Sequence, residues 1–404
     1  MRRMNEYSMD VYQYELDHGV NPFIRYKEED CSEEEKRELE DWLFNLMREK
    51  DIIPIPILDE HAEQEDMIRL SELDPYSVYD AENGDYGPNP IGVTFLNKFF
   101  HRELCDIRKP GSPMTIYEGF HDDKMLRRVV KKGLAYTSDI SGIFRWFYMC
   151  SCGFCTNFRP ATVKALLEVW GPKENGAYLD TSAGYGARCL GAHYAKNINT
   201  YVGIDPNTAD SCAEEIEYLD KYYPTGTEKK VLKMGSEDFT VERFPEFRES
   251  YDIAATSPPY FNTEMYSDDP SQSYKKFPTY ARWCEGFLQA TIDNTCDMLK
   301  SDGIFMMNIF EKVPNIKKII QLFLANNGWY VFRTDKYLLK TMPGLMKDPE
   351  TGEKVVKSRG KYDNYEPVFV AAHWSRLLKE GLITEEQAKE FKKRAIKDIH
   401  DIDI

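Results

Sequence analysis

The chain has 404 residues, of which 42% are hydrophobic and 30% charged, and this composition is typical of a globular protein with enough chain to bury a core. No stretch approaches the roughly 18 uninterrupted apolar residues of a membrane span, and residues 1–10 lack the apolar core of a secretory signal. The formal net charge of −16 argues against a generally nucleic-acid-binding surface, because phosphate favours basic side chains.

The N-terminal part of the chain is predicted to be mostly helical. Residues 33–50 predict an amphipathic helix, because Ser32 is a suitable N-cap and apolar residues follow at helical spacing. Residues 73–93 are rich in Pro, Gly, Asp, Asn and Tyr without periodicity, which predicts a loop. Residues 122–132 predict a second helix with Met125, Leu126, Val129 and Val130 facing inward.

Charge is placed unevenly along the chain. Residues 28–41 are strongly acidic, whereas residues 124–132 and 336–361 are basic. Two interpretations of the basic segments stay open at this point: a local basic groove on an acidic body, or ordinary solvated faces.

From residue 160 onward, short apolar strands alternate with helices. Strands are expected at 177–180, 201–205, 251–256 and 303–310, with helices at 161–170, 209–221, 280–300 and 314–327. Such alternation predicts a mostly parallel sheet with helices on both faces. Two late strands, 330–338 and 366–374, are expected to form a hairpin with a long insertion, and 383–399 predicts a charged terminal helix.

A glycine turn follows the first of these strands. Asp180 ends the strand, and the turn contains Ser182, Ala183, Gly184 and Gly186 before a helix begins. Ligands of open parallel sheets bind beyond the carboxyl ends of the strands, where glycines let the backbone come close. Asp180 could hold a cationic amino group there.

Acidic residues also follow the next two strands. Asp205, before Pro206, stands where a carboxylate commonly binds ribose hydroxyls, and Glu237 and Asp238 could accept a hydrogen bond from an adenine amino group. Three acidic positions at successive strand ends predict a nucleoside cofactor. The missing G-x-G-x-x-G pattern argues against a dinucleotide.

The fourth strand leads into Ser257-Pro258-Pro259-Tyr260-Phe261. Two prolines remove two amide donors but keep the carbonyls, so the loop becomes rich in acceptors. Ser257 Oγ and the Pro258 carbonyl could accept the hydrogens of a planar amino group, which frees the nitrogen lone pair. Tyr260 offers a stacking face for a base taken out of its duplex.

These segments together resemble the amino-directed DNA methyltransferases, and more narrowly the methylase-like proteins of phages and mobile elements. The resemblance rests on residues 158–160 (FRP), 179–192 (LDTSAGYGARCLGA), 202–207 (VGIDPN) and 256–267 (TSPPYFNTEMYS), and it covers roughly residues 140–375. It implies a Rossmann-like class I fold, S-adenosylmethionine as the cofactor, and methyl transfer to cytosine N4 or adenine N6 in DNA.

The resemblance also implies roles for individual residues. Phe158, Arg159 and Pro160 match the segment that covers the methionine end of the cofactor. Asp180, Ser182, Ala183, Gly184, Gly186, Asp205, Pro206, Glu237 and Asp238 match the cofactor site, and Ser257, Pro258, Pro259 and Tyr260 the catalytic loop. The residues expected to bind the substrate are Phe261, Tyr365 and the basic insertion residues Lys354, Lys357, Arg359 and Lys361.

Only about 70 residues separate the two loops, so no target-recognition domain fits between them. We therefore expect an accessory or target-recognition region at 1–140, a methyltransferase domain at 141–376 with the insertion 336–361, and a C-terminal helix at 377–404. The expected partner is double-stranded DNA with a flipped base, and a homodimer and a restriction partner are open questions. Two alternatives remain: transfer to RNA, a nucleotide or a protein glutamine, and a non-catalytic nucleic-acid-binding methylase fold.

Nine cysteines at irregular spacing, without a signal peptide, predict a reducing cytoplasm, bacterial or of a phage-infected cell. Cys150, Cys152 and Cys155 depart from the family pattern. They could bind zinc with a fourth ligand or an iron–sulfur cluster, but no second close pair is visible, so we expect reduced thiols and no metal.

Overall fold

The computed structural model describes residues 3–155, 157–263, 265–310, 313–339, 345–347, 354–356 and 365–398. The chain forms two compact units. The first holds Met1–Leu70, Ile91–Asn157 and Asn262–Gln272, and the second holds Ser71–Pro90, Phe158–Phe261 and Ser273–Ile404. Each unit is thus built from three separate segments of the chain. The regions expected from the sequence, 1–140, 141–376 and 377–404, are single continuous segments, and this division stays a prediction.

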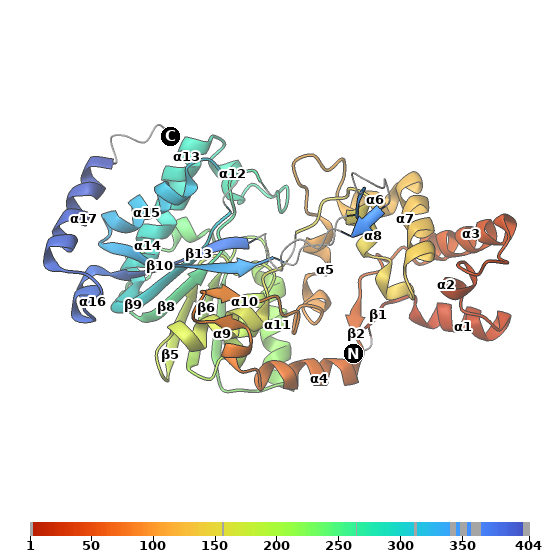
Figure 1. The fold of residues 1–404 in the computed structure, drawn as a ribbon, viewed down its shortest axis with the longest axis horizontal. Coiled ribbons are helices and arrows are strands. Elements are labelled where there is room, and N and C mark those ends of the chain that lie inside the picture. The colour runs from red at the N-terminus through yellow and green to blue at the C-terminus, as the bar shows by residue number, and fades with distance from the viewer. Residues whose placement is uncertain are drawn as a thin grey trace. The chain divides into compact units, whose positions relative to one another are not determined.

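A nine-stranded sheet organises the second unit (Figure 1). Its strand order is β3-β4-β10-β13-β9-β8-β5-β6-β7. The strands are β3 (Tyr79–Asp80), β4 (Asp85–Tyr86), β5 (Gly176–Asp180), β6 (Ile198–Ile204), β7 (Glu228–Leu232), β8 (Tyr251–Thr256), β9 (Leu299–Asn308), β10 (Trp329–Leu338) and β13 (Tyr365–His373). Neighbours from β7 to β9 pair in parallel, and β13 is antiparallel to both β9 and β10.

Side chains of the central strands alternate between two apolar clusters, one on each face of the sheet. Tyr178 packs into one cluster and Leu179 into the other, and Tyr201 and Val202 divide in the same way. Strands buried on both faces are expected in a parallel sheet covered by helices. The predicted α/β, Rossmann-like sheet with helices on both faces is therefore confirmed.

One face of the sheet is covered by α9 (Pro160–Trp170), α10 (Ala187–Tyr194) and α11 (Ala209–Tyr222). The other face is covered by the continuous run α13 (Tyr280–Trp283), η5 (Cys284–Gln289) and α14 (Ala290–Met298), together with α15 (Ile316–Asn326). The unit also contains the short helices α12 (Ser273–Lys276), which precedes α13, and α16 (Trp374–Lys379), and the longer helix α17 (Glu385–Asp398).

The region expected to be a loop at 73–93 contains two short strands instead. β4 pairs with the edge strand β10 in parallel, and β3 pairs with β4. A buried network holds this segment: the carboxylate of Asp335 on β10 accepts a hydrogen bond from Tyr79 at 3.1 Å and another from Arg333 at 2.6 Å. Strands of two residues are too short to show a period of two, so the sequence pattern missed them.

The first unit is mostly helical, as expected. Its helices are α1 (Ser8–His18), α2 (Pro22–Arg25), α3 (Glu33–Lys50), α4 (Glu60–Ser71), α5 (Asn97–Cys105), α6 (Ile116–His121), α7 (Asp123–Tyr136) and α8 (Arg145–Met149), with one small sheet of β1 (Arg3–Met4) and β2 (Ile57–Leu58). Ser32 is the N-cap of α3, as predicted, and it forms a capping box with Glu35. In α7 the four side chains expected to face inward, Met125, Leu126, Val129 and Val130, are all buried.

The insertion between β10 and β13 contains the antiparallel pair β11 (Leu345–Lys347) and β12 (Lys354–Val356). The predicted hairpin of the two late strands is confirmed, with a register from Trp329–His373 to Leu338–Tyr365. Within the described residues, no helix has the length and apolar character needed to cross a membrane.

Candidate active site

The glycine loop lies where β5 ends, at the carboxyl edge of the parallel strands. Gly184 has φ +57° and Gly186 φ +73°, a left-handed conformation that residues with a Cβ rarely adopt. The amide of Ala183 donates to the carbonyl of Ile204 at 2.9 Å. The loop is thereby fixed against the end of β6.

Asp205, directly after β6, joins two loops. Its Oδ2 accepts a hydrogen bond from the Gly184 amide at 3.0 Å, and its Oδ1 accepts from the amides of Asn207 and Thr208, both at 2.9 Å. The structure thus brings together Gly184 and Asp205, which are 21 residues apart and were both predicted as cofactor residues. The half-buried Pro206 continues this edge.

Asp180 is fully buried and is engaged by the protein itself. Both carboxylate oxygens lie 2.9 Å from Nε of Arg188, and Tyr201 and the Ser182 amide also donate to it, at 3.1 and 3.2 Å. Burial raises the pKa of Asp180, and the Arg188 guanidinium opposes that shift. In this structure the Asp180 carboxylate binds Arg188, and its expected role in holding a cationic amino group stays a prediction.

The FRP segment leads directly into α9 and lies near Arg188. Phe158 stacks on Tyr337 of β10 with ring centroids 4.5 Å apart, and the Arg159 guanidinium lies 4.5 Å from the centroid of the same ring. Arg188 lies 5.9 Å from the Phe158 ring. Nη1 of Arg159 is buried and makes no hydrogen bond with any described residue.

Glu237 and Asp238, after β7, share one cation. Lys276 bonds to Glu237, and its Nζ lies 3.0 Å from Oδ2 of Asp238. Burial lowers the pKa of Lys276, but its hydrogen bonds to these two carboxylates outweigh that effect and raise it overall. Both predicted acids lie at the expected strand end, and one lysine offsets one of their two negative charges.

The proline loop begins where β8 ends at Thr256. Ser257, the first residue of the loop, is half-buried. Tyr260 is only 7% exposed, its hydroxyl donates to the Asn308 carbonyl, and its ring lies 5.8 Å from that of Phe310. The predicted stacking face of Tyr260 is therefore inside the core in this structure. The next residue, Phe261, has φ +52°, a strained conformation for an aromatic residue.

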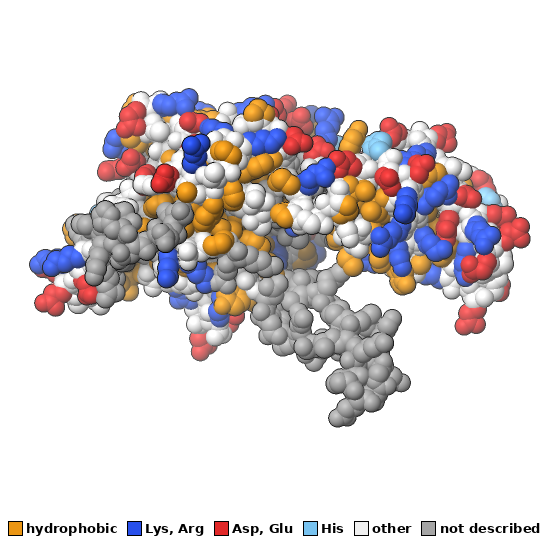
Figure 2. Space-filling model, turned by 90° about the horizontal axis from the view of Figure 1, so that it is seen from above, with side chains coloured by type: hydrophobic (Ala, Val, Ile, Leu, Met, Phe, Trp, Pro, Cys, Tyr) orange, Lys and Arg blue, Asp and Glu red, His pale blue; other side chains and the backbone are white. Residues whose placement is uncertain are grey.

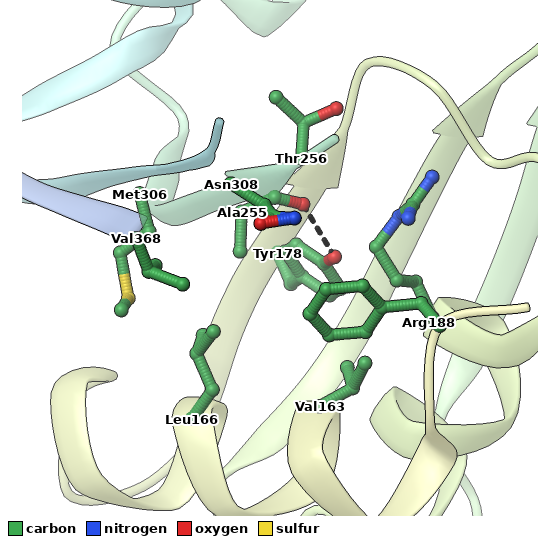
Figure 3. Close-up of a pocket in the computed structure, with 10 residues that line it drawn as sticks. Val163, Leu166, Tyr178, Arg188, Ala255, Thr256, Met306, Asn308 and Val368 are labelled. Carbon is green, nitrogen blue, oxygen red and sulfur yellow. Dashed lines mark hydrogen bonds between the residues drawn. The ribbon is translucent and has the colours of Figure 1, made fainter. Parts of the chain in front are cut away.

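A pocket is lined in part by Ala255 and Thr256, the last two residues of β8 (Figure 3). Thr256 and Asn308 contribute polar side chains from the ends of β8 and β9, while Val163 and Leu166 of α9 face them from the opposite side. Thr256 Oγ1 and Asn308 Oδ1 are buried, and neither makes a hydrogen bond with a described residue. Buried polar atoms are normally paired, so these two unpaired oxygens of the pocket lining are suited to receive N–H groups of a ligand.

The predicted substrate residues are only partly described. Tyr365 begins β13 at the same sheet edge and is 41% exposed, with the Lys336 ammonium 5.8 Å from its ring. Lys357, Arg359 and Lys361 lie outside the described residues, and of Lys354 only the backbone in β12 is described.

Sequence reasoning missed two polar residues of this site, Arg188 and Asn308. Asn308 could have been found by the rule applied to Asp180 and Asp205, because it is a polar residue at the end of an apolar strand. A weaker signal marked Arg188, a charged residue within the mostly apolar helix that follows the glycine loop.

The three clustered cysteines belong to the first unit. Cys150 and Cys152 are buried, and burial raises the pKa of both thiols, that of Cys152 to about 11. In the described part of the chain, no three His, Cys, Asp or Glu side chains are grouped as metal ligands would be.

Comparisons with known proteins give structural similarity alone. No protein-family model and no curated protein matches the chain. Among solved structures, the chain is similar to a putative methyltransferase from Thermoplasma acidophilum, with 12% sequence identity over 55% of this chain and 77% of that one and a TM-score of 0.31. It is also similar to a SAM-dependent O-methyltransferase from Thermotoga maritima, with 12% identity over 57% of this chain and 70% of that one and a TM-score of 0.34. It is also similar to TrmN from Thermus thermophilus (14%, 53% and 48%, 0.32). Similarity at this level carries no argument about activity.

Proposed function

We propose that this chain transfers the methyl group of S-adenosylmethionine to the exocyclic amino group of a DNA base, cytosine N4 or adenine N6. The proposal rests on the position of two loops at the carboxyl edge of the parallel strands. There the glycine loop, joined to Asp205 by a 3.0 Å hydrogen bond, and the Ser-Pro-Pro-Tyr loop follow the neighbouring strands β5 and β8.

The residues present fit a nucleoside cofactor. A Cβ added at Gly184 would find its nearest neighbours at 3.5 Å or more, so the loop leaves room for a ligand that approaches the backbone. The buried and unpaired Nη1 of Arg159 could pair with a carboxylate, and the Asp205 carboxylate is half-buried at the same edge. S-adenosylmethionine, when bound, supplies an electrophilic methyl group.

The chain's own residues would act on the target nitrogen. That nitrogen is a poor nucleophile, because its lone pair is delocalised into the base. Ser257 Oγ and the Pro258 carbonyl, as hydrogen-bond acceptors, favour a pyramidal nitrogen whose lone pair is free. These bonds strengthen as the nitrogen gains positive charge, so they stabilise the transition state more than the bound substrate.

A second candidate keeps the chemistry and changes the substrate. RNA, a free nucleotide or a protein glutamine also presents an amino nitrogen on a planar group. Among these three, the net charge of −16 favours the protein glutamine, because RNA and nucleotides carry negatively charged phosphate.

Tritiated methyl transfer tests the proposal. The purified protein is incubated with tritiated S-adenosylmethionine and unmodified DNA, RNA or denatured protein, and labelled DNA is digested and its nucleosides identified by mass spectrometry. We expect N4-methylcytosine or N6-methyladenine. Transfer to RNA or protein alone would change the substrate, and cofactor binding without transfer to any of them would indicate a non-catalytic fold.

A further inference from the structure

The outer face of α7 carries five cations, and they fall into two groups. Arg127 and Lys131 lie against acids of α3: Arg127 is 2.7 Å from Asp41, and Lys131 is 3.5 Å from Glu40. The other three, Lys124, Arg128 and Lys132, form no ion pair with any described residue. They follow one another at intervals of four residues, so they share one stripe of the helix.

A fourth cation, Arg145 at the start of α8, extends this stripe. The Lys132 ammonium lies 5.3 Å from the centroid of Tyr136, and the Arg145 guanidinium lies 5.5 Å from that of Trp146. The two rings are themselves 5.3 Å apart. An aromatic ring attracts a cation without cancelling its charge, so these contacts position both cations and leave them positive. We call Lys124, Arg128, Lys132 and Arg145 the α7 basic surface.

The acids nearest in sequence are already occupied. Asp123 pairs with Arg48 at 2.6 Å, and the Asp122 side chain caps α7 through the Met125 amide at 2.7 Å. The opposite face of α7 is buried in the unit, which holds the helix in place. Figure 2 shows basic side chains gathered on the unit that carries α7. On a chain with a net charge of −16, an unneutralised positive stripe requires an explanation.

We propose that the α7 basic surface binds the phosphate backbone of DNA. The inference rests on the proposed function in one respect, that the phosphates belong to the substrate. Four residues of helix rise about 6 Å, close to the roughly 7 Å by which two nucleotides advance along one strand. Regular single charges of this kind suit a polyphosphate, and they carry no base specificity.

The test uses three variants of the full chain. Lys124→Gln/Arg128→Gln/Lys132→Gln removes the unpaired cations, and Arg127→Gln/Lys131→Gln removes the paired ones as a matched control. Lys124→Arg/Arg128→Lys/Lys132→Arg keeps the charge. Binding of a fluorescein-labelled DNA duplex is followed by anisotropy at several salt concentrations, with thermal melting as the check on folding.

We expect the first variant to bind DNA roughly tenfold or more weakly than the wild type at low salt. The slope of the logarithm of its binding constant against the logarithm of salt concentration should also fall in magnitude by about two to three, since each phosphate contact releases counterions. The control and the charge-keeping variant should bind like the wild type. An unchanged slope in the first variant, an equal loss in the control, or competition by polyglutamate as strong as by DNA would overturn the inference.

Methyl transfer to DNA, measured alongside, separates the two proposals. If DNA is methylated but the salt dependence of DNA binding is the same with and without the cations of the α7 basic surface, the inference fails and the proposed function stands. If the slope falls as expected but no DNA is methylated, the surface is real and the proposed function fails.

Discussion

The Gly184 amide donates a hydrogen bond to Oδ2 of Asp205 at 3.0 Å, so the loop after β5 and the carboxylate after β6 form one structural element. Oδ1 of the same side chain accepts two further amides, those of Asn207 and Thr208. One carboxylate thus fixes the backbone of both loops that border the proposed cofactor site.

Replacing Asp205 tests this arrangement. Asp205→Ala should weaken S-adenosylmethionine binding by more than tenfold, because charge-assisted hydrogen bonds to ribose and the support of the glycine loop are lost together. Asp210→Asn is the matched control, since Asp210 lies five residues on and pairs with Lys233 at the surface. Calorimetry that gives the same affinity for Asp205→Ala and wild type would remove Asp205 from the site.

The strand ends explain why the sequence predicted this pair. Apolar runs such as Tyr178–Leu179 and Tyr201–Val202 indicated strands buried on both faces, and polar residues directly after such strands meet at one edge. The rest of the site depends on tertiary contacts. No spacing rule pairs Asp180 with Arg188, and no pattern shows that Tyr260 turns into the core rather than toward a base.

The division into units was also beyond sequence patterns. Residues 262–272 directly follow the proline loop but belong to the first unit, where Met265 and Arg108 exchange two backbone hydrogen bonds of 2.9 Å. A pairing across more than 150 residues leaves no local signature in composition or periodicity.

His193 should make the protein sensitive to acid. Its ring is buried between the Tyr223 carbonyl at 2.8 Å and the Thr225 hydroxyl at 3.2 Å, and burial lowers its pKa from 6.5 to about 4. In the unfolded chain the His193 ring binds a proton below about pH 6.5, whereas in the folded chain it does so only near pH 4. Because protonation favours the unfolded chain between these two values, the protein loses stability as the pH falls from 6.5 to 4.

The expected loss from His193 is roughly 3 kcal/mol in the free energy of unfolding between pH 7.5 and 4. Urea denaturation of His193→Gln should show a smaller acid-induced loss than the wild type. His61→Gln is the control, because the His61 side chain is 83% exposed. Parallel pH profiles for wild type and His193→Gln would contradict the assignment.

Glu215 should act in the opposite direction. It is completely buried on α11, neither carboxylate oxygen bonds to a described residue, and burial raises its pKa well above 4.5. In the unfolded chain this carboxyl ionises at ordinary pH, so folding becomes less favourable as the pH rises from 4.5 toward the folded pKa.

Glu215→Gln should therefore melt at a higher temperature than wild type at pH 8, and the difference should shrink toward pH 4.5. The exposed neighbour offers a control, Glu214→Gln, which should leave the melting temperature unchanged at both pH values. A wild type that is more stable than Glu215→Gln at pH 8 would show that the buried carboxylate is charged and paired.

The clustered thiols should be free of metal. None of the nine cysteines forms a disulfide in the structure, and Cys155 is the partly exposed member of its cluster, where Cys150 and Cys152 are buried. Elemental analysis should find far less than one equivalent of zinc or iron, and a thiol reagent should count nine thiols after unfolding without a chelator. One equivalent of zinc per chain would assign these cysteines to a metal site.

The proline loop gives the most direct test of the chemistry, because Ser257 and Tyr260 should fail in different ways. Ser257→Ala should lower kcat by roughly tenfold, the factor that about 1.4 kcal/mol of transition-state stabilisation supplies, and leave KM for DNA nearly unchanged. Tyr260→Phe removes only the hydroxyl that donates to the Asn308 carbonyl, and it keeps the ring. If the ring turns out of the core to stack on a flipped base, Tyr260→Phe should retain substrate affinity, whereas Tyr260→Ala should lose both rate and affinity, since base–aromatic stacking is worth about 1–3 kcal/mol.

Thermal melting must accompany Tyr260→Ala, because truncating a buried aromatic residue costs roughly 3–5 kcal/mol of stability. Calorimetry should show cofactor binding intact in all three variants, and full methylation by a folded Tyr260→Ala would mean that this loop is not the catalytic site.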